Sequence, residues 1–225
     1  MNLPDPERHH LEISSTARYY TLGEIGPTAS ELWFVLHGYG QRILDMVEPF
    51  RSHRRSGRLI VIPEGLSRFY LSHKDRTIGA SWMTAEDRKA EIRDYIGYLN
   101  RLVHSLQENG VPENTSLTVL GFSQGSATAT RWLADGTVKA QRLILWGGIP
   151  AFELCTEEFQ TRVLVDRIQM VTGTEDRYTS PERMKKTGAV ISKNGRPVEF
   201  VVFEGPHEIH APTLTDLMEA SVSDG

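Results

Sequence analysis

Short apolar runs rich in β-branched residues alternate with longer helical patterns along this chain of 225 residues, and this alternation strongly constrains its fold. Two of the runs, 59–62 and 143–146, are apolar without interruption, which is typical of parallel strands buried on both faces. The alternation predicts an α/β fold: a mostly parallel central sheet with helices on both faces. We expect strands at 19–22, 32–36, 59–62, 117–120, 143–146, 168–171 and 198–203.

The clearest helical pattern begins near Thr84, where the T-x-x-D spacing to Asp87 fits a capping box. One apolar stripe follows it at three- and four-residue steps: Ile92, Ile96, Leu99, Val103 and Leu106. No repeat or linker divides the chain, so we expect a single domain over 1–225, with 1–15 as a loosely ordered N-terminal segment.

Two inter-strand segments bear on the site. The segment 63–83 reads as a long irregular loop, which in a compact domain is usually functional or mobile. Only about twenty residues separate the strands that contain Trp146 and Ile168, so no large cap domain is expected.

Charge and hydropathy exclude several classes of protein. A net charge of −4 argues against a general nucleic-acid binder. No apolar run approaches the roughly 18 residues that a membrane-spanning helix needs. The polar N-terminus lacks the apolar core of a secretory signal, so we expect a cytoplasmic protein. One basic cluster is expected to be a solvated helix end: Arg51, His53, Arg54, Arg55 and Arg58.

The sequence Gly-Phe-Ser-Gln-Gly at 121–125 matches the G-x-S-x-G pattern of a nucleophile elbow. The strand candidate at 117–120 precedes it, and small residues that suit a closely packed helix follow it. In this arrangement a strained turn exposes the serine hydroxyl, and the glycines let strand and helix approach closely. The pattern predicts Ser123 as a nucleophile and the backbone N–H of Gln124 as an oxyanion donor.

A second oxyanion donor is expected in the His-Gly-Tyr-Gly segment at 37–40, directly after the strand at 32–36. Tyr39 N–H is the candidate, with its neighbour Gly40 as the alternative. His37 precedes the serine, whereas the order in α/β-hydrolases is serine, acid, histidine. We therefore expect His37 to fix the loop by hydrogen bonds rather than to act as the base.

The acid and the base are expected after later strands. Asp176 follows the strand at 168–171 and is the predicted acid, with Glu175 as its rival, whereas Asp166 lies before that strand. His207 follows a glycine turn after the last strand and is the predicted base, with His210 as its rival. The other histidines are expected at the surface: His9, His10, His53, His73 and His104.

These residues predict a serine hydrolase whose substrate is a small-molecule carboxylic ester or thioester. His207 takes the Ser123 proton, Asp176 orients the imidazole, and an acyl-enzyme forms that water then hydrolyses. No metal or organic cofactor is expected, and the lone Cys155, surrounded by glutamates, is expected to be a bystander. Two alternatives remain: a catalytically silent binding module, and the same triad cleaving a lactone, an amide or a C–C bond.

From about residue 30 to 220 the chain resembles the phospholipase/carboxylesterase family, which includes acyl-protein thioesterases and small bacterial esterases. The similar segments are L-H-G-Y-G at 36–40, G-A-S-W at 79–82, G-F-S-Q-G at 121–125, G-T-E-D at 173–176 and G-P-H-E-I at 205–209. The resemblance implies the α/β-hydrolase fold and supports Asp176 and His207 over their rivals.

The chain departs from that family at Gln41, where an Asp is common, and at Ser126, where a second glycine often follows the elbow. The segment 64–70 is unusual for thioesterases and suggests a separate bacterial esterase subgroup. Aromatic side chains are expected to wall a pocket for small to medium acyl chains: Tyr39, Phe69, Tyr70 and Trp82. Nothing in the sequence indicates the oligomeric state.

Overall fold

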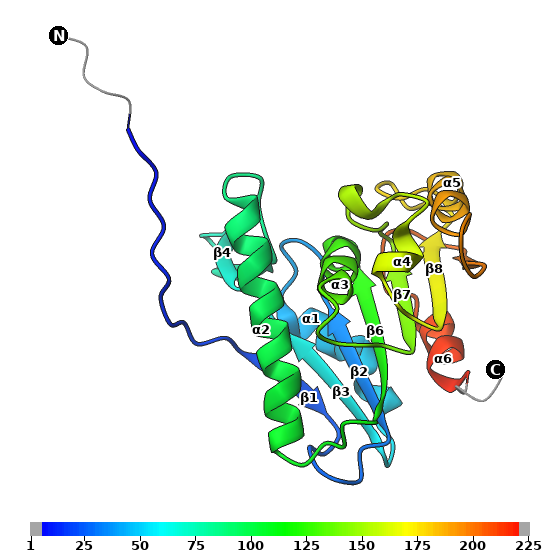
Figure 1. Cartoon of the computed structure of the whole chain (residues 1–225), viewed down its shortest axis with the longest axis horizontal. Coiled ribbons are helices and arrows are strands. Elements are labelled where there is room, and N and C mark those ends of the chain that lie inside the picture. Colours follow the sequence, from blue (N-terminus) through cyan, green and yellow to red (C-terminus); the bar gives the residue numbers. More distant parts are fainter. Residues whose placement is uncertain (1–5, 221–225) are drawn as a thin grey trace.

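The fold, taken from a computed structural model that describes residues 6–220, is built on one seven-stranded sheet (Figure 1). The order is β1-β3-β2-β6-β7-β8-β9; β1 pairs antiparallel with β3, and the other neighbours are parallel. All the strand candidates belong to this sheet, so the predicted fold class is confirmed. Its strands are β1 (Tyr19–Leu22), β2 (Glu31–Leu36), β3 (Arg58–Pro63), β6 (Ser116–Phe122), β7 (Arg142–Trp146), β8 (Arg167–Gly173) and β9 (Glu199–Phe203).

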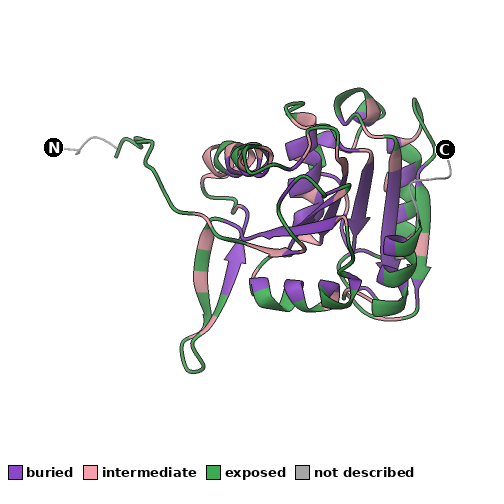
Figure 2. Cartoon of the chain, turned by 90° about the horizontal axis from the view of Figure 1, so that it is seen from below, coloured by how far each residue is buried: buried purple, intermediate pink, exposed green. Residues whose placement is uncertain are grey.

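Helices cover both faces of the sheet (Figure 2). Successive strand residues point to opposite faces, so Val119 packs in a cluster with Trp132 of α3, whereas Leu120 packs in another with Met46 of α1 and Leu217 of α6. The first cluster also holds side chains of α2, α4 and α5. The helices are α1 (Ile43–Val47), η1 (Glu48–His53), α2 (Arg88–Glu108), α3 (Gln124–Ala134), η2 (Phe152–Leu154), α4 (Phe159–Arg162), α5 (Pro181–Ile191) and α6 (Ala211–Glu219).

Helix α2 starts later than the sequence predicts. It begins at Arg88 with Asp87 as the preceding residue, so the capping box at Thr84 is wrong. The N–H and hydroxyl of Thr84 instead donate to the Glu91 carboxylate, at 2.6 and 3.0 Å, because Glu91 in the first turn reaches back to the loop. The predicted stripe does face the core, and it is widened by Tyr95, Tyr98 and Leu102.

The segment 63–83 is not an irregular loop. It forms an antiparallel hairpin of β4 (Ser67–Ser72) and β5 (Thr77–Ser81), with a shift in register between Tyr70 and Ser72. The two strands of the hairpin pair with each other, and an isolated β-bridge between Gln41 and Ala80 joins the hairpin to the loop after β2. From Ser67 to Tyr70 the side chains alternate between half-buried and exposed, since only one face meets the body of the molecule, but Tyr70 and Leu71 are both exposed.

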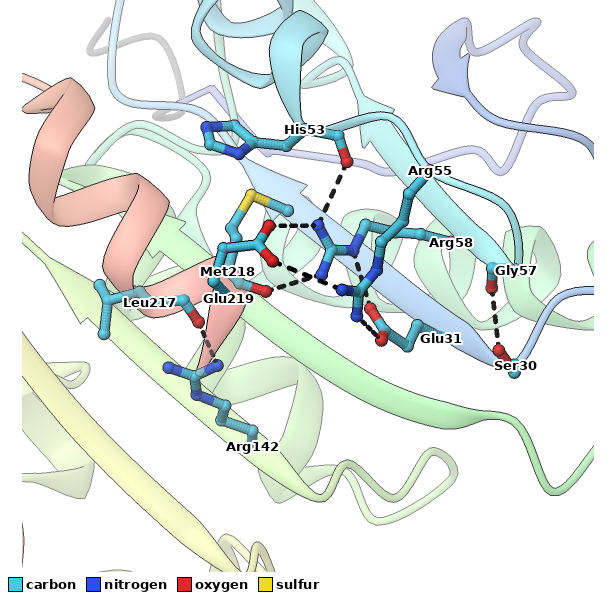
Figure 3. A network of polar contacts seen from close by, with 10 residues as sticks. All are labelled: Ser30, Glu31, His53, Arg55, Gly57, Arg58, Arg142, Leu217, Met218 and Glu219. Carbon is cyan, nitrogen blue, oxygen red and sulfur yellow. Dashed lines mark hydrogen bonds and ion pairs between the residues drawn. The ribbon is translucent and has the colours of Figure 1, made fainter. Parts of the chain in front are cut away.

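The basic cluster is only partly a solvated helix end. Arg58 and His53 are buried, whereas the other three arginines are exposed. The Arg58 guanidinium donates to Glu31 at 2.7 Å, to the Met218 carbonyl at 2.6 Å and to the His53 carbonyl at 3.2 Å (Figure 3). These partners come from β2, η1 and the end of α6, which explains why the charge pattern alone did not predict burial.

Two further features complete the fold. Residues 6–18 contain no helix or strand and extend outward from β1 (Figure 1), but Arg8 and His10 contact Glu86 and Asp87 at 2.7 and 2.8 Å, just before α2. Residues 1–5 of the expected N-terminal segment lie outside the described residues. Between residues 6 and 220, no helix combines the length and the apolar character that crossing a membrane requires.

Candidate active site

Ser123 occupies a strained turn between β6 and α3. Its φ is 55° and its ψ is −116°, in a region that residues with a side chain rarely adopt. A Cβ on Gly121 would lie 2.3 Å from the Gly125 carbonyl oxygen, and one on Gly125 would lie 2.1 Å from the Leu36 oxygen. The turn therefore requires glycine on both sides of the serine. The Ser123 N–H donates to Trp146 O at 2.8 Å, which anchors the turn to β7.

Asp176 and His207 form a hydrogen-bonded pair at the same edge of the sheet. Asp176 follows β8, His207 follows β9, and His207 Nδ1 lies 2.7 Å from Asp176 Oδ2. The other carboxylate oxygen accepts the N–H groups of Tyr178 and Thr179, both at 2.8 Å, so the Asp176 side chain is held rigidly. A proton on Nδ1 leaves His207 Nε2 as an acceptor, which is the state that a general base needs.

Both rivals to this pair lie elsewhere. Glu175 is exposed, whereas the Asp176 side chain is only 1% exposed. His210 packs flat on Phe203 at 4.8 Å, and its Nδ1 lies 2.9 Å from Thr213 Oγ1. The structure therefore gives neither Glu175 nor His210 a contact that a triad would use.

His207 is packed against the elbow. Its ring lies 4.8 Å from the ring of Phe122, the residue before the serine. A Cβ on Gly147 would lie 2.9 Å from His207 Cε1 and 3.2 Å from Asp176 Oδ2, so only glycine fits beneath the pair. Among residues 6–220 no hydrogen bond joins Ser123 to His207; such bonds often tighten only in the complex with substrate.

The loop at 37–41 offers one unengaged N–H group. Gly40 N donates to Ala80 O at 2.8 Å, and Gly38 N donates to the Gln41 side-chain oxygen at 2.9 Å. Within the described chain Tyr39 N–H has no acceptor, which favours Tyr39 over Gly40 as an oxyanion donor. Gln124 is the first residue of α3, so its N–H has no partner inside the helix.

His37 and Trp82 support this loop from beneath. The His37 side chain is fully buried: Nδ1 lies 2.7 Å from Gly38 O, and Nε2 accepts the Gly65 N–H at 2.9 Å. Burial lowers the pKa of His37, so the ring is neutral and serves a structural role. Trp82 stacks on it at 4.9 Å and donates to the His37 carbonyl at 2.9 Å. Trp82 is only 2% exposed, so the structure places it in the core rather than in the wall of a pocket.

The Gln124 side chain adds a contact that the sequence did not predict. Its amide oxygen accepts the Trp82 N–H at 3.1 Å, and its amide nitrogen donates to Met83 O at 2.8 Å. These bonds tie the residue after Ser123 to the end of the β4–β5 hairpin. The Gln124 side chain therefore holds the end of the hairpin, and the hairpin in turn supports the 37–41 loop.

A cavity of about 310 Å³ opens beside Ser123, and it is walled by residues that sequence reasoning missed. Its lining includes Ser123, Ile149, Phe152, Tyr178 and two arginines, Arg131 and Arg183. The glycine-rich segment after β7 could have predicted this part of the site, because the loops that follow parallel strands gather at the same edge of the sheet.

The predicted aromatic pocket lies apart from this cavity. Tyr39 is exposed and Phe69 half-buried, with ring centroids 5.5 Å apart, whereas Tyr70 is exposed and contacts His73. None of these side chains lines the cavity beside Ser123. In the described part of the chain, no group of three or more His, Cys, Asp or Glu side chains is placed to hold a metal ion.

Comparison with known proteins gives a consistent result. A model of the phospholipase/carboxylesterase family matches residues 27–220. Among curated proteins no sequence matches the chain.

The solved structures similar to this chain include esterase PE8, with 17% identity and a TM-score of 0.68, covering 91% of this chain and 97% of that one. They also include acyl-protein thioesterase 2 of Zea mays, with 15% identity, a TM-score of 0.67 and the same coverage. A phospholipase/carboxylesterase of Dyadobacter fermentans is 14% identical, with a TM-score of 0.61 and coverage of 93% and 98%.

Proposed function

This chain belongs to the phospholipase/carboxylesterase family of α/β-hydrolases, a family of carboxylic ester hydrolases, and from that premise we propose that it is a serine esterase with the triad Ser123, Asp176 and His207. The observation that carries the proposal is the 2.7 Å Asp176–His207 pair packed beside the strained elbow serine. If Asp176 and His207 were only a structural ion pair, nothing would require them to lie at the same edge of the sheet as Ser123 and beside a cavity.

The reaction follows from the roles of these groups. His207 Nε2 takes the Ser123 proton as Ser123 Oγ attacks the ester carbonyl, and Asp176 stabilises the charged imidazole. The N–H groups of Tyr39 and Gln124 donate to the oxyanion of the tetrahedral intermediate. The intermediate collapses to an acyl-enzyme as His207 gives its proton to the leaving alcohol. Water, activated by the same histidine, then releases the acid and restores Ser123.

The size of the cavity supports a modest substrate. A volume of about 310 Å³ is at the lower end of small-molecule sites, and no inserted domain covers it. We propose esters or thioesters with small to medium acyl chains.

The experiment is hydrolysis of p-nitrophenyl esters from acetate to octanoate by the wild type and by Ser123→Ala. We expect the variant to lose at least ~10³-fold in kcat. Stoichiometric labelling of the wild type, but not the variant, by a fluorophosphonate would separate an enzyme from a silent binding module. Full activity in the variant would refute Ser123 as the nucleophile, and an inactive but labelled wild type would redirect the search to another acyl bond.

A further inference from the structure

The charged residues that line the cavity beside Ser123 are both arginines. Arg131 comes from α3 and Arg183 from the first turn of α5, and no acidic side chain lines the cavity. A cavity walled by cations and by apolar groups suits a ligand that carries both a hydrocarbon portion and a negative charge.

Arg131 already has its counter-ion. Its Nε donates to Glu153 at 2.7 Å and its Nη2 at 3.3 Å, and Arg88 donates to the same carboxylate at 2.7 Å. Chiefly because of the hydrogen bond from Arg131, the pKa of Glu153 falls to about 2, so this carboxylate is ionised. Arg131 and Arg88 therefore share the Glu153 carboxylate. Glu153 makes no hydrogen bond or ion pair with Arg183.

Arg183 has no such partner among the described residues. Arg183 is exposed, and its side chain makes one hydrogen bond with the described chain, from Nη1 to the Tyr178 carbonyl at 3.2 Å, so most of its five N–H donors have no protein acceptor. The nearby acids are engaged elsewhere: Glu182 pairs with Lys186 at 2.8 Å, and Asp176 is closed off by His207.

We propose that Arg183 binds a carboxylate of the substrate, so that the preferred ester is one that carries a free carboxylate a few carbons from the scissile carbonyl. This inference rests on the proposed esterase function and specifies its substrate class. The planar guanidinium can receive both oxygens of a carboxylate at once, which fixes the orientation of the ester relative to Ser123.

The cavity is open to solvent, so its volume of about 310 Å³, that of a sphere roughly 8 Å across, gives the scale of the spacing rather than an upper limit. An acyl group of about five carbons that ends in a carboxylate, such as a glutaric acid monoester, spans that length. Its methylene groups would then lie against the apolar lining, which includes Ile149 and Phe152.

The test compares charged and neutral esters that have the same skeleton. One arm uses mono-p-nitrophenyl glutarate against its methyl ester, which places the carboxylate on the acyl part. The second arm uses 4-acetoxybenzoate against methyl 4-acetoxybenzoate, which places it on the leaving group. We expect the wild type to prefer the charged ester in one arm, and Arg183→Gln to lower kcat/KM for that ester at least tenfold.

Two controls separate recognition from other effects. Because Arg183 lines the cavity, the readout is the ratio of kcat/KM for the charged ester to that for its neutral counterpart, which Arg183→Gln is expected to lower at least tenfold; stoichiometric fluorophosphonate labelling of the variant checks that Ser123 is still reactive. Lys185→Gln removes an exposed charge from the same helix but does not line the cavity, and it should leave both activities unchanged.

Each outcome has a distinct meaning. A selective fall in kcat/KM for the charged ester in Arg183→Gln supports the proposal. The arm in which this fall occurs shows which side of the ester carries the carboxylate. Equal activity of Arg183→Gln and the wild type on both charged esters would overturn it while the esterase function stands. A wild type inactive on every ester would overturn the proposed function itself.

Discussion

At the level of single residues, two adjacent acids follow β8, and their surroundings differ sharply. Asp176 is buried, receives two backbone N–H groups on one oxygen and holds His207 with the other. Glu175 is exposed. We expect Asp176→Asn to keep the fold, because an amide oxygen still accepts both N–H groups, but to lose about 10³- to 10⁴-fold in kcat, because the amide disfavours the required tautomer of His207. Steady-state hydrolysis of a p-nitrophenyl ester measures the loss.

The matched control for that prediction is Glu175→Gln. It removes the neighbouring charge without touching the His207 hydrogen bond, so its kcat should stay within about twofold of the wild type. A large loss in Glu175→Gln together with a small loss in Asp176→Asn would exchange the two roles.

His37 makes the stability of the fold depend on pH. Burial lowers its pKa in the folded state, so the unfolded chain binds a proton that the folded chain does not. The stability gained from a neutral His37 is therefore complete above the unfolded pKa of about 6.5, and it is lost as the pH falls below that value. We expect urea denaturation to give a smaller free energy of unfolding at pH 5.5 than at pH 7.5.

His53 contributes in the same direction, because burial first and then the charge of Arg58 lower its pKa. The double variant His37→Gln, His53→Gln should therefore show a weaker pH dependence between pH 5.5 and 7.5 than the wild type. An unchanged pH dependence in this variant would show that other groups titrate in that window.

At the level of elements, the β4–β5 hairpin holds the 37–41 loop in place. Gly40 N donates to Ala80 O, Ala80 N donates to Gln41 O at 3.2 Å, and the Gln124 side chain holds the end of the hairpin. A Cβ on Gly79 would lie 2.2 Å from the Gly40 carbonyl oxygen. The hairpin can therefore approach the loop only because residue 79 is glycine.

Gly79→Ala should displace the loop and with it the Tyr39 N–H. We expect kcat to fall by about 10²-fold, the size of effect that follows loss of one oxyanion donor, with little change in the helical circular dichroism. Gly97→Ala in α2 is the matched control, since the nearest atom to its new Cβ is the end of the Arg101 side chain at 3.5 Å. Equal kcat values for the two variants would mean that the hairpin does not support the loop.

The elements differ in how far the sequence predicts them. Parallel strands such as β3 and β7 are buried along their whole length, so their continuous apolar runs mark them clearly. Along β4 burial alternates weakly and the chain carries Arg68 on its exposed face, so no periodic signal distinguishes this strand from a loop. The cavity wall was missed for a related reason: Phe152 lies in the three-residue helix η2 and Tyr178 in a loop, where no sequence pattern indicates which way a side chain points.

At the level of the whole molecule, buried arginines join segments far apart in the sequence. Arg58 and Arg142 both lie near Trp33, with guanidinium carbons 6.0 and 5.7 Å from the centre of its ring. Both donate to carbonyls at the end of α6 (Figure 3). These contacts give hydrogen-bond donors to carbonyls that have no partner at the end of a helix. They also place positive charge at the negative end of the α6 dipole. Their burial depends on α6, about 160 residues after Arg58, which a local reading of charge cannot anticipate.

The last prediction concerns this junction. Burial alone would raise the pKa of Glu31, but hydrogen bonds from Arg58 and Arg55 hold that pKa below its ordinary value, so Glu31 is ionised and depends on them. Arg58→Met leaves a half-buried carboxylate without its buried partner and opens the end of α6. We expect the free energy of unfolding to fall by about 3 kcal/mol.

Arg54→Met serves as the control, because Arg54 is exposed and makes none of these contacts, and it should change stability by less than about 0.5 kcal/mol. The proposed triad lies at the opposite ends of the parallel strands from this junction, so the folded Arg58→Met protein should keep the kcat of the wild type. Urea denaturation at pH 7 combined with ester hydrolysis separates the two effects. Equal stability of the two variants would mean that packing around Trp33, rather than the ion pair, holds α6 to the sheet.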